Sequence, residues 1–253
     1  MNLLASIKLA RSRGAAPIIA EIKRRIPKLA AEHNRPRDER EAGLLAGVYE
    51  KGGAAGISVV AERRYFGGDP ERDIPAVLRA TALPLLIKDF ILDYPAVDYY
   101  AGLAEKTAPG FAGRVTLLLH AHMLGERLVD MLAYVHACGM QALIETRGVQ
   151  DLSLLRPLGK RAQIVGINNK NIDELEIGED RLRITPGIVA AYRKVIGEAV
   201  IISQSAHRNA ADIRFALEAG ADAVLAGTAV MLSPDPAAAV FAFVRAGEGD
   251  CHG

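Results

Sequence analysis

The chain has 253 residues, half of them apolar, and its 31 basic and 30 acidic residues leave a formal net charge of +1. This balance gives no electrostatic basis for binding nucleic acid or a membrane surface, although a small anionic ligand needs only local positive charge. No apolar run approaches the ~20 residues that cross a bilayer. The first residues, MNLLASIKLARSRG, lack the apolar core of a secretory signal, and Cys138 and Cys251 are too few for a disulfide framework. We therefore expect a cytoplasmic protein.

Short apolar runs alternate with amphipathic helical stretches along the chain, a pattern typical of successive βα units. The helical stretch at 38–53 can close in a left-handed conformation at Gly52 and Gly53, and the stretch at 208–222 repeats this design with Gly220. We expect eight strands, in chain order PIIAEIK (17–23), GISVVA (56–61), LPLLIKDF (83–90), RVTLLL (114–119), QALIET (141–146), QIVGINN (163–169), AVIISQS (199–205) and AVLAG (223–227).

Eight such units in about 250 residues match the size of a (β/α)8 TIM barrel. We predict one barrel domain over residues 1–253, with a short N-terminal helical extension at 1–16 and a tail at 246–253 that is expected to fray. The alternative is a doubly wound open sheet. It is less favoured because no Gly-rich dinucleotide fingerprint follows the first strand.

Polar side chains stand where these strands end, which in a TIM barrel is the end that carries the chemistry. A single Glu or Lys at the end of a strand is more often an ordinary residue of the barrel rim. Burying so many charged side chains without partners costs free energy, however, so their joint occurrence indicates a shared site. Glu21 and Lys23 are two residues apart on one strand and therefore share a face. The strand-end residues are Glu21, Lys23, Lys88, His120, Glu145, Asn168, Asn169, Gln204, Ser205, Gly227 and Thr228.

Several segments of the chain occur in the same order in one known family. They are AEIKR (20–24), GGAAGISV (52–59) with YFGG (65–68), LLIKDFILD (85–93), LIE (143–145), GINNKNI (166–172) and AGTAVM (226–231). At these segments the chain resembles indole-3-glycerol phosphate synthase, the barrel enzyme of tryptophan biosynthesis, over nearly its whole length from residue 17. The resemblance implies a carboxy-lyase that closes an indole ring on a carboxyphenylamino-deoxyribulose phosphate. The reaction loses CO2 and water and needs neither a metal nor an organic cofactor.

The resemblance also implies roles for individual residues. Lys88 matches the general acid that protonates the substrate carbonyl, and Lys23 matches the lysine that holds the carboxylate and assists proton transfer. Glu145 matches the carboxylate that handles protons during dehydration. Glu21 and Asn168 match residues that orient the substrate and its hydroxyl groups.

The same resemblance implies where the substrate lies. Phe66 and Phe90 match apolar contacts to the aromatic ring. The phosphate is expected between the last two strand-to-helix loops, where small residues let backbone N–H groups approach an anion. The residues expected there are Lys170, Ser205, Ala206, Gly227 and Thr228.

Some family positions are altered in this chain. Ile26 stands where the family's SPSKG loop has a serine, and Lys170 replaces an arginine, which removes the planar bidentate fork. The family's strand-seven ESG is here Gln204-Ser205-Ala206, so an amide replaces a carboxylate at a candidate catalytic position.

Further features fall outside the resemblance. Family members commonly have a long helical extension before the first strand, whereas 16 residues precede Pro17 in this sequence, so we expect the loop at 23–40 to form a lid or, equally, a solvated connection. His120 and His122 could face one metal from a strand, but no third ligand has persuasive spacing, so we expect no metal site. His207 could contact an anionic ligand, but a position at the surface of the rim is favoured.

Three functions are compatible with this pattern. The favoured one is the family's lyase reaction on a small phosphorylated substrate, with the protein a monomer or weak homo-oligomer. The second is a paralogous enzyme that uses the same lysines and glutamate on another phosphorylated or carboxylated substrate. The third, a noncatalytic binding barrel, is disfavoured because it has no physical reason to keep costly charges at strand ends.

Overall fold

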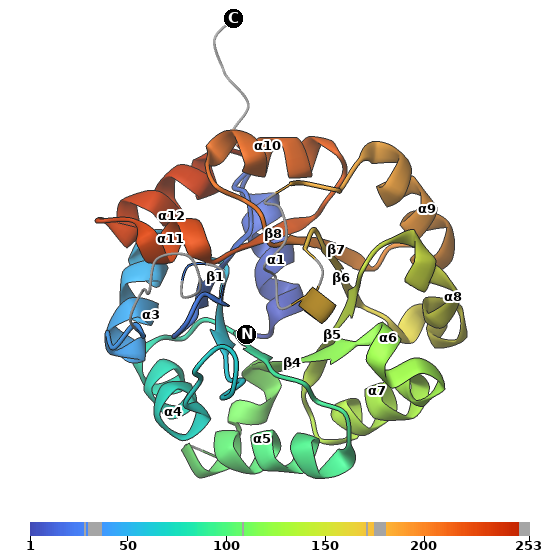
Figure 1. Ribbon diagram of the computed structural model, residues 1–253, viewed down its shortest axis with the longest axis horizontal. Helices are drawn as coiled ribbons and strands as arrows, with labels where there is room; N and C mark the ends of the chain where they lie inside the picture. Colours follow the sequence, from blue (N-terminus) through green and yellow to red (C-terminus); the bar gives the residue numbers. More distant parts are fainter. Residues whose placement is uncertain (28, 30–36, 108, 171, 175–180, 248–253) are drawn as a thin grey trace, which may run out of the picture.

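Eight parallel strands close into a barrel in chain order, and helices surround it (Figure 1). The computed structural model describes residues 1–27, 29, 37–107, 109–170, 172–174 and 181–247. The predicted TIM barrel is confirmed, and the open sheet is excluded because β1 pairs with both β2 and β8. The strands are β1 (Ile18–Ile22), β2 (Gly56–Val60), β3 (Leu85–Lys88), β4 (Val115–His120), β5 (Gln141–Thr146), β6 (Ile164–Asn168), β7 (Val200–Gln204) and β8 (Ala223–Ala226).

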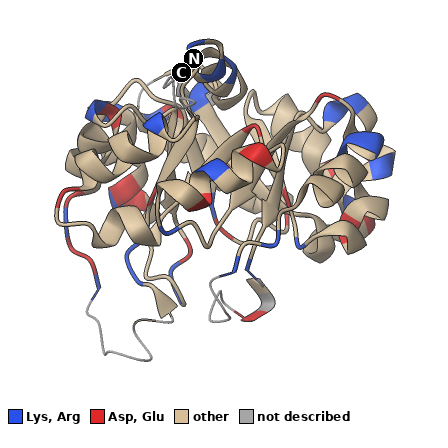
Figure 2. Ribbon diagram, turned by 90° about the horizontal axis from the view of Figure 1, so that it is seen from above, with Lys and Arg blue, Asp and Glu red and all other residues tan. Residues whose placement is uncertain are grey.

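The outer layer consists of helices that follow the strands. The longer ones are α3 (Ala42–Lys51), α4 (Pro70–Ala80), α5 (Tyr94–Thr107), α7 (Leu128–Ala137), α9 (Pro186–Ile196), α10 (Ala210–Glu218) and α12 (Pro236–Arg245). Short helices α6 (Ala121–Leu124), α8 (Leu152–Leu155) and α11 (Thr228–Leu232) lie between them. Basic and acidic residues are interspersed over the helices (Figure 2), in keeping with the net charge. Within the described part of the chain, no helix combines the length and apolarity needed to cross a membrane.

Local sequence explains where these helices begin and end. The side chains of Asn209 and Thr185 accept hydrogen bonds from backbone N–H groups in the first turns of α10 and α9. Gly53 (φ +90°) and Gly220 (φ +102°) take the predicted left-handed conformation after α3 and α10. Gly52 remains right-handed, with φ −71°.

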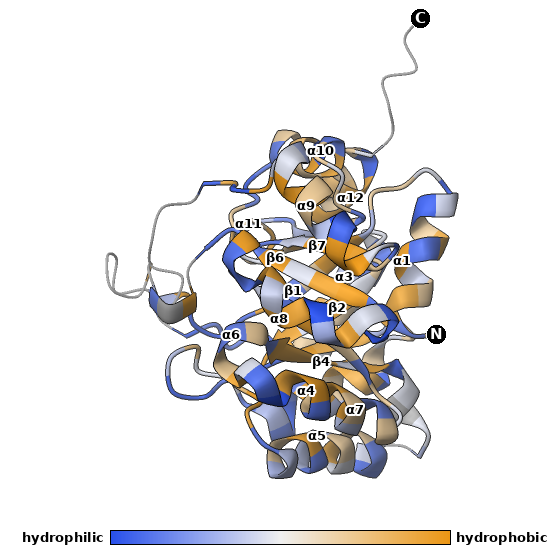
Figure 3. Cartoon of the chain, turned by 90° about the vertical axis from the view of Figure 1, so that its right-hand side faces the viewer, coloured by the Kyte–Doolittle hydropathy of each residue, from blue (hydrophilic) through white to orange (hydrophobic). Residues whose placement is uncertain are grey.

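The N-terminal helix α1 (Leu3–Ser12) closes the amino-terminal end of the barrel. Figure 3 shows it at one end of the strands, with α6 and α11 toward the other. Ser6 donates to the carbonyl of Ala55, just before β2, and Leu4 N–H donates to Gln141, the first residue of β5. Leu3 and Ile7 pack on the apolar layer inside the barrel, which comprises Ile19, Leu86, Leu118, Leu143, Ile164, Val200, Ile202, Ala223 and Leu225.

Strand alternation leads from this apolar layer to the polar mouth. Beyond Ile19 the next inward positions of β1 and its extension are Glu21 and Lys23, and beyond Leu86 the next is Lys88. The apolar layer therefore forms the floor of a polar site at the carboxyl ends. Helix α1 lies beneath that floor, so it does not cover the site. Part of the predicted lid at 23–40, namely residues 28 and 30–36, lies outside the described residues, and so does most of the predicted tail at 246–253, namely residues 248–253.

Candidate active site

One carboxylate lies between two buried lysines at the mouth of the barrel. Lys23 Nζ is 3.0 Å from Glu21 Oε1, and Lys88 Nζ is 3.2 Å from Glu21 Oε2. The side chain of Glu21 is 2% exposed and those of Lys23 and Lys88 are 6% and 10% exposed. Two ammonium groups can be buried this deeply only with a compensating anion. Alternation placed Glu21 and Lys23 on one face, and the ion pair shows that they meet there.

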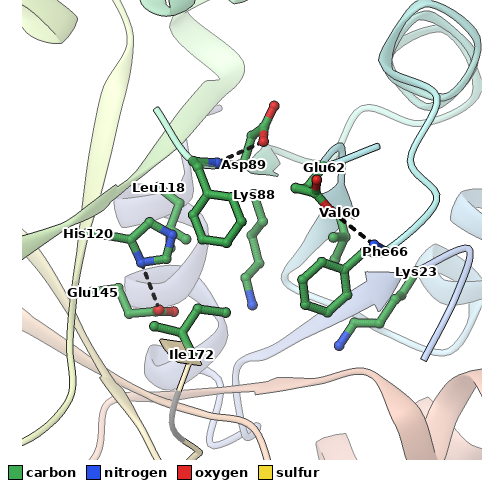
Figure 4. A pocket seen from close by; sticks show the side chains of 11 residues that line it. Lys23, Val60, Glu62, Phe66, Lys88, Asp89, Leu118, His120, Glu145 and Ile172 are labelled. Atoms are coloured by element: carbon green, nitrogen blue, oxygen red, sulfur yellow. Dashed lines mark hydrogen bonds and ion pairs between the residues drawn. The ribbon is translucent and has the colours of Figure 1, made fainter. Parts of the chain in front are cut away.

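A cavity of about 330 Å³ opens beside these lysines and has an aromatic wall. Phe66 and Phe90, the predicted ring contacts, both line it, and Lys23 Nζ lies 5.3 Å from the centre of the Phe66 ring. Figure 4 shows Lys88 and Glu145 among its lining side chains. Ile172 also lines this cavity and was not predicted, because it lies in a short 3-10 helix (Ile172–Glu174) after β6 that has no apolar period. We call this cavity the aromatic compartment.

Glu145 lies next to a histidine in the wall of the aromatic compartment. His120 ends β4 and pairs in register with Glu145 of β5, so both side chains point inward. The distance from His120 Nδ1 to Glu145 Oε1 is 3.2 Å, and both side chains are at most 3% exposed (Figure 4). The predicted proton-handling carboxylate thus has an imidazole as its neighbour.

A second cavity, of about 730 Å³, lies between the loops that follow β7 and β8. All five residues predicted to bind phosphate line it, together with Glu21, and Lys23 lines both this cavity and the aromatic compartment. Arg208 lines it too and was not predicted. We call this cavity the anion compartment, and its lining residues with positive side chains are Lys23, Lys170 and Arg208.

Gly227 is required by the close approach of Glu21. A Cβ at Gly227 would lie 2.6 Å from Glu21 Oε1, so any other residue would displace the carboxylate that holds both lysines. The glycine of the predicted phosphate loop therefore serves the lysine cluster as well.

The turn after β7 has an unusual backbone for its residue types. Ser205 and Ala206 have φ values of +63° and +65°, a region that residues with a Cβ seldom adopt. The turn directs both residues into the anion compartment. Strain of this kind is commonly found at functional sites.

We expect Ala206→Gly to stabilise the protein by about 1 kcal/mol, because a left-handed conformation costs ~1–2 kcal/mol with a Cβ and little for glycine. The midpoint of urea unfolding, followed by circular dichroism, measures the change. Ala190→Gly is the matched control, since Ala190 lies exposed in the interior of α9, where the same change costs about 1 kcal/mol. Equal destabilisation by both variants would refute the strain at Ala206.

Gln204 is fully buried at the end of β7, directly before Ser205, and does not itself line either compartment. Neither its amide oxygen nor its amide nitrogen has a hydrogen-bond partner among the described residues. Its Nε2 lies over Gly166, where a Cβ would approach to 1.8 Å. Leaving both groups of a buried amide unpaired costs free energy, so Gln204 has hydrogen-bonding capacity to offer a ligand or water.

Asn168, the last residue of β6, and Asn169, which follows it, make different hydrogen bonds. Asn168 accepts a hydrogen bond from Lys170 N–H, and its Nδ2 has no partner among the described residues. Asn169 donates from Nδ2 to the Ser203 hydroxyl and to the carbonyl of Gln204, and its Oδ1 accepts from two backbone N–H groups. Asn168 thus keeps an amide donor at the end of β6, although it lines neither compartment, whereas Asn169 fastens β6 to β7.

His207 is buried, and the expectation that it lies on the surface is wrong. Its Nε2 is 3.0 Å from the Ser203 hydroxyl, and 4% of the residue is exposed. Burial lowers its pKa to about 4, although a backbone hydrogen bond to Leu225 opposes the shift. His207 is therefore neutral near pH 7. The left-handed turn at Ser205 and Ala206 brings the chain back over β7, which buries the ring.

Two loops that shape the site are held by buried carboxylates. Glu62 accepts hydrogen bonds from the backbone N–H groups of Arg64, Tyr65 and Phe66, which fixes Phe66 at the aromatic compartment. Arg24, 1% exposed, binds Asp73 through both Nε and Nη2. Burial opposes the charge of Arg24, but its hydrogen bonds and the negative charge of Asp73 outweigh burial and raise its pKa. Neither the hydrogen bonds to Glu62 nor the pairing of Arg24 with Asp73 was predicted from the sequence.

Among the described residues, no three His, Cys, Asp or Glu side chains come together as a metal site would require. His120 and His122 lie with ring centres 6.2 Å apart and nearly perpendicular.

Comparison with known proteins identifies the family. The sequence model of indole-3-glycerol phosphate synthase matches residues 4–243. The chain belongs to the indole-3-glycerol phosphate synthase family. It is 36% identical to the indole-3-glycerol phosphate synthase of Deinococcus radiodurans over 227 aligned residues. The aligned region covers 90% of this chain and 77% of the Deinococcus radiodurans protein. It is 36% identical to the indole-3-glycerol phosphate synthase of Kineococcus radiotolerans, over 91% of this chain and 76% of that protein. It is 32% identical to the indole-3-glycerol phosphate synthase of Methanopyrus kandleri, over 96% of this chain and 88% of that protein.

Membership of the indole-3-glycerol phosphate synthase family makes the protein a carboxy-lyase-type enzyme of tryptophan biosynthesis, as the resemblance implied. The fold places the family-like residues Glu21, Lys23, Lys88 and Glu145 at one mouth. A noncatalytic barrel is therefore disfavoured.

Proposed function

We propose that the protein closes the indole ring of indole-3-glycerol phosphate on a carboxyphenylamino-deoxyribulose phosphate, with release of CO2 and water. The observation that carries this proposal is the junction of the two compartments at Lys23. A ligand with an aromatic acid at one end and a phosphate at the other matches an aromatic compartment and an anion compartment that share a lysine.

Ring closure uses the two lysines. Lys88 donates a proton to the substrate carbonyl oxygen while the aromatic carbon that bears the carboxylate attacks the carbonyl carbon. Lys23 holds that carboxylate, and Glu21 keeps both ammonium groups in place. The C–C bond to the carboxylate then breaks, CO2 leaves, and its electron pair restores the aromatic ring.

Dehydration uses Glu145. A C–H proton from the carbon next to nitrogen passes to Glu145, and the electron pair of that bond forms the ring double bond. The neighbouring C–O bond breaks, and the hydroxyl leaves as water with a proton from Lys88, which lines the same cavity as Glu145 and has taken up a new proton from solvent after ring closure. Asn168 and Gln204, whose amide Nδ2 and Nε2 groups have no partner among the described residues, orient the hydroxyl groups of the substrate.

Phosphate binding uses the anion compartment. Lys170 supplies charge, while the small residues Ser205, Ala206, Gly227 and Thr228 allow backbone N–H groups to approach the phosphate oxygens. Lys170 acts as a point charge rather than as a bidentate fork.

The deciding experiment incubates purified protein with the carboxyphenylamino-deoxyribulose phosphate and follows indole absorbance. Formation of indole-3-glycerol phosphate supports the proposal. Failure to form it, while inorganic phosphate still binds, would favour the second function, a paralogous reaction on another phosphorylated or carboxylated substrate. The altered positions Ile26, Lys170 and Gln204 favour that alternative.

The substitution Gln204→Glu tests how the amide limits the reaction. We expect kcat to rise, by up to about 10², because a preorganised negative charge can stabilise positive charge that develops in the transition state. We also expect lower stability, because the new charge is fully buried. Gln163→Glu, at an exposed position just before β6, is the control and should change neither quantity. A fall in kcat would show that this protein uses the amide itself.

A further inference from the structure

His120 is a buried titratable side chain to which the family resemblance gives no role. It occupies the last position of β4, opposite Glu145 in the β4–β5 register. Strand alternation turns both side chains toward the inside of the barrel, and His120 lines the aromatic compartment together with Lys88 and Glu145. Its imidazole is therefore in the wall that the substrate ring would face.

The described residues around His120 do not provide a hydrogen-bond partner for its Nδ1 atom. Its Nδ1 is buried and has no aligned hydrogen-bond partner among the described residues, although Glu145 Oε1 is only 3.2 Å away. The ring centre lies 5.3 Å from that of Phe90, with the planes tilted by 32°. If His120 served only to pack against Phe90, an apolar ring at this position would make the protein more stable, because a buried N–H without a hydrogen-bond partner costs free energy.

We infer that His120 is a positioning residue for Glu145. A rotation of the imidazole aligns Nδ1–H with Glu145 Oε1, so that the histidine donates a hydrogen bond to the carboxylate and leaves Oε2 to receive the C–H proton. The Phe90 ring packs beside the imidazole, with the two ring centres 5.3 Å apart. The inference rests on the proposed function, because Glu145 is the proton acceptor of the dehydration step.

Two substitutions separate the hydrogen bond from the packing. His120→Phe keeps a ring against Phe90 and removes the donor, whereas His120→Asn keeps an N–H group close to the position of Nδ1. We expect the Phe variant to lose about 10-fold to 100-fold in kcat with little change in KM, as for a lost hydrogen bond to a charged group. The Asn variant should recover most of the loss. In a Glu145→Gln background, His120→Phe should have little further effect.

His122→Phe is the control, because His122 does not line the aromatic compartment. Equal losses in His120→Phe and His120→Asn, or losses that add to that of Glu145→Gln, would overturn the inference.

A measurement without turnover distinguishes this inference from the proposed function. In protein labelled with ¹⁵N-histidine, NMR should show a protonated, hydrogen-bonded Nδ1 at His120 whose signal shifts in Glu145→Gln. If the substrate is not turned over but this signal is present, the proposed reaction fails and the pairing stands. An unbonded Nδ1 would contradict the pairing whatever the activity.

Discussion

Replacing Lys88 by alanine is expected to lower kcat by about 10³, within the 10²–10⁴ range attributed to a positioned general acid. The physical reason is that Lys88 lies against the aromatic compartment with its Nζ held by Glu21. No other described lysine lines that compartment except Lys23, which is assigned to the substrate carboxylate. Single-turnover formation of the indole chromophore measures the loss directly.

The fold should survive this change, because Glu21 keeps Lys23 as a partner at 3.0 Å. Lys51→Ala, at an exposed position in the last turn of α3, is the matched control and should retain full activity. A Lys88→Ala variant with kcat near that of the wild type would remove Lys88 from the mechanism. A loss confined to KM would assign it to binding instead.

Replacing Arg24 by alanine is expected to destabilise the protein by about 3–5 kcal/mol, because the change leaves the buried carboxylate of Asp73 without its partner. The Arg24 Nη1 also donates to the carbonyl of Asp38, so the chain that follows β1 loses an anchor. Urea unfolding followed by circular dichroism reports the difference in free energy of unfolding. This is a large part of the ~5–15 kcal/mol that stabilises a typical protein.

The neighbouring residue provides the control. Arg25 is exposed, and Arg25→Ala should leave the unfolding midpoint nearly unchanged. The double variant Arg24→Met with Asp73→Leu should be more stable than Arg24→Ala, because removing both charges avoids an unpaired buried carboxylate. If Arg24→Ala and Arg25→Ala were equally stable, the buried pair would contribute nothing measurable.

The barrel was predictable because its signals are local. Each strand is a short apolar run, and the eight runs recur with helical stretches between them. Boundaries were less accurate: the run at 83–90 contributes only Leu85–Lys88 to β3, because the chain leaves the ladder at Asp89. The inward-facing residues of the site followed from the two-residue period of strands, which is why Glu21, Lys23 and Lys88 could be assigned to one mouth.

What the sequence did not predict depends on contacts between distant residues. Arg24 and Asp73 are 49 positions apart, and nothing in either local sequence indicates the partner. The pairing of His120 with Glu145 depends on the register between β4 and β5. His207 was misplaced because left-handed turns are recognised by glycine, and this one is made by Ser205 and Ala206.

Lys23 borders both compartments, and this has a consequence for the end of the catalytic cycle. The proposed substrate has two anionic ends, a carboxylate that we propose Lys23 binds and a phosphate that we propose the loops after β7 and β8 bind. The proposed reaction discards the carboxylate as neutral CO2, so the product keeps only the phosphate anchor. Attraction between ligand and site therefore weakens as the chemistry proceeds, which favours departure of the product over its retention as an inhibitor.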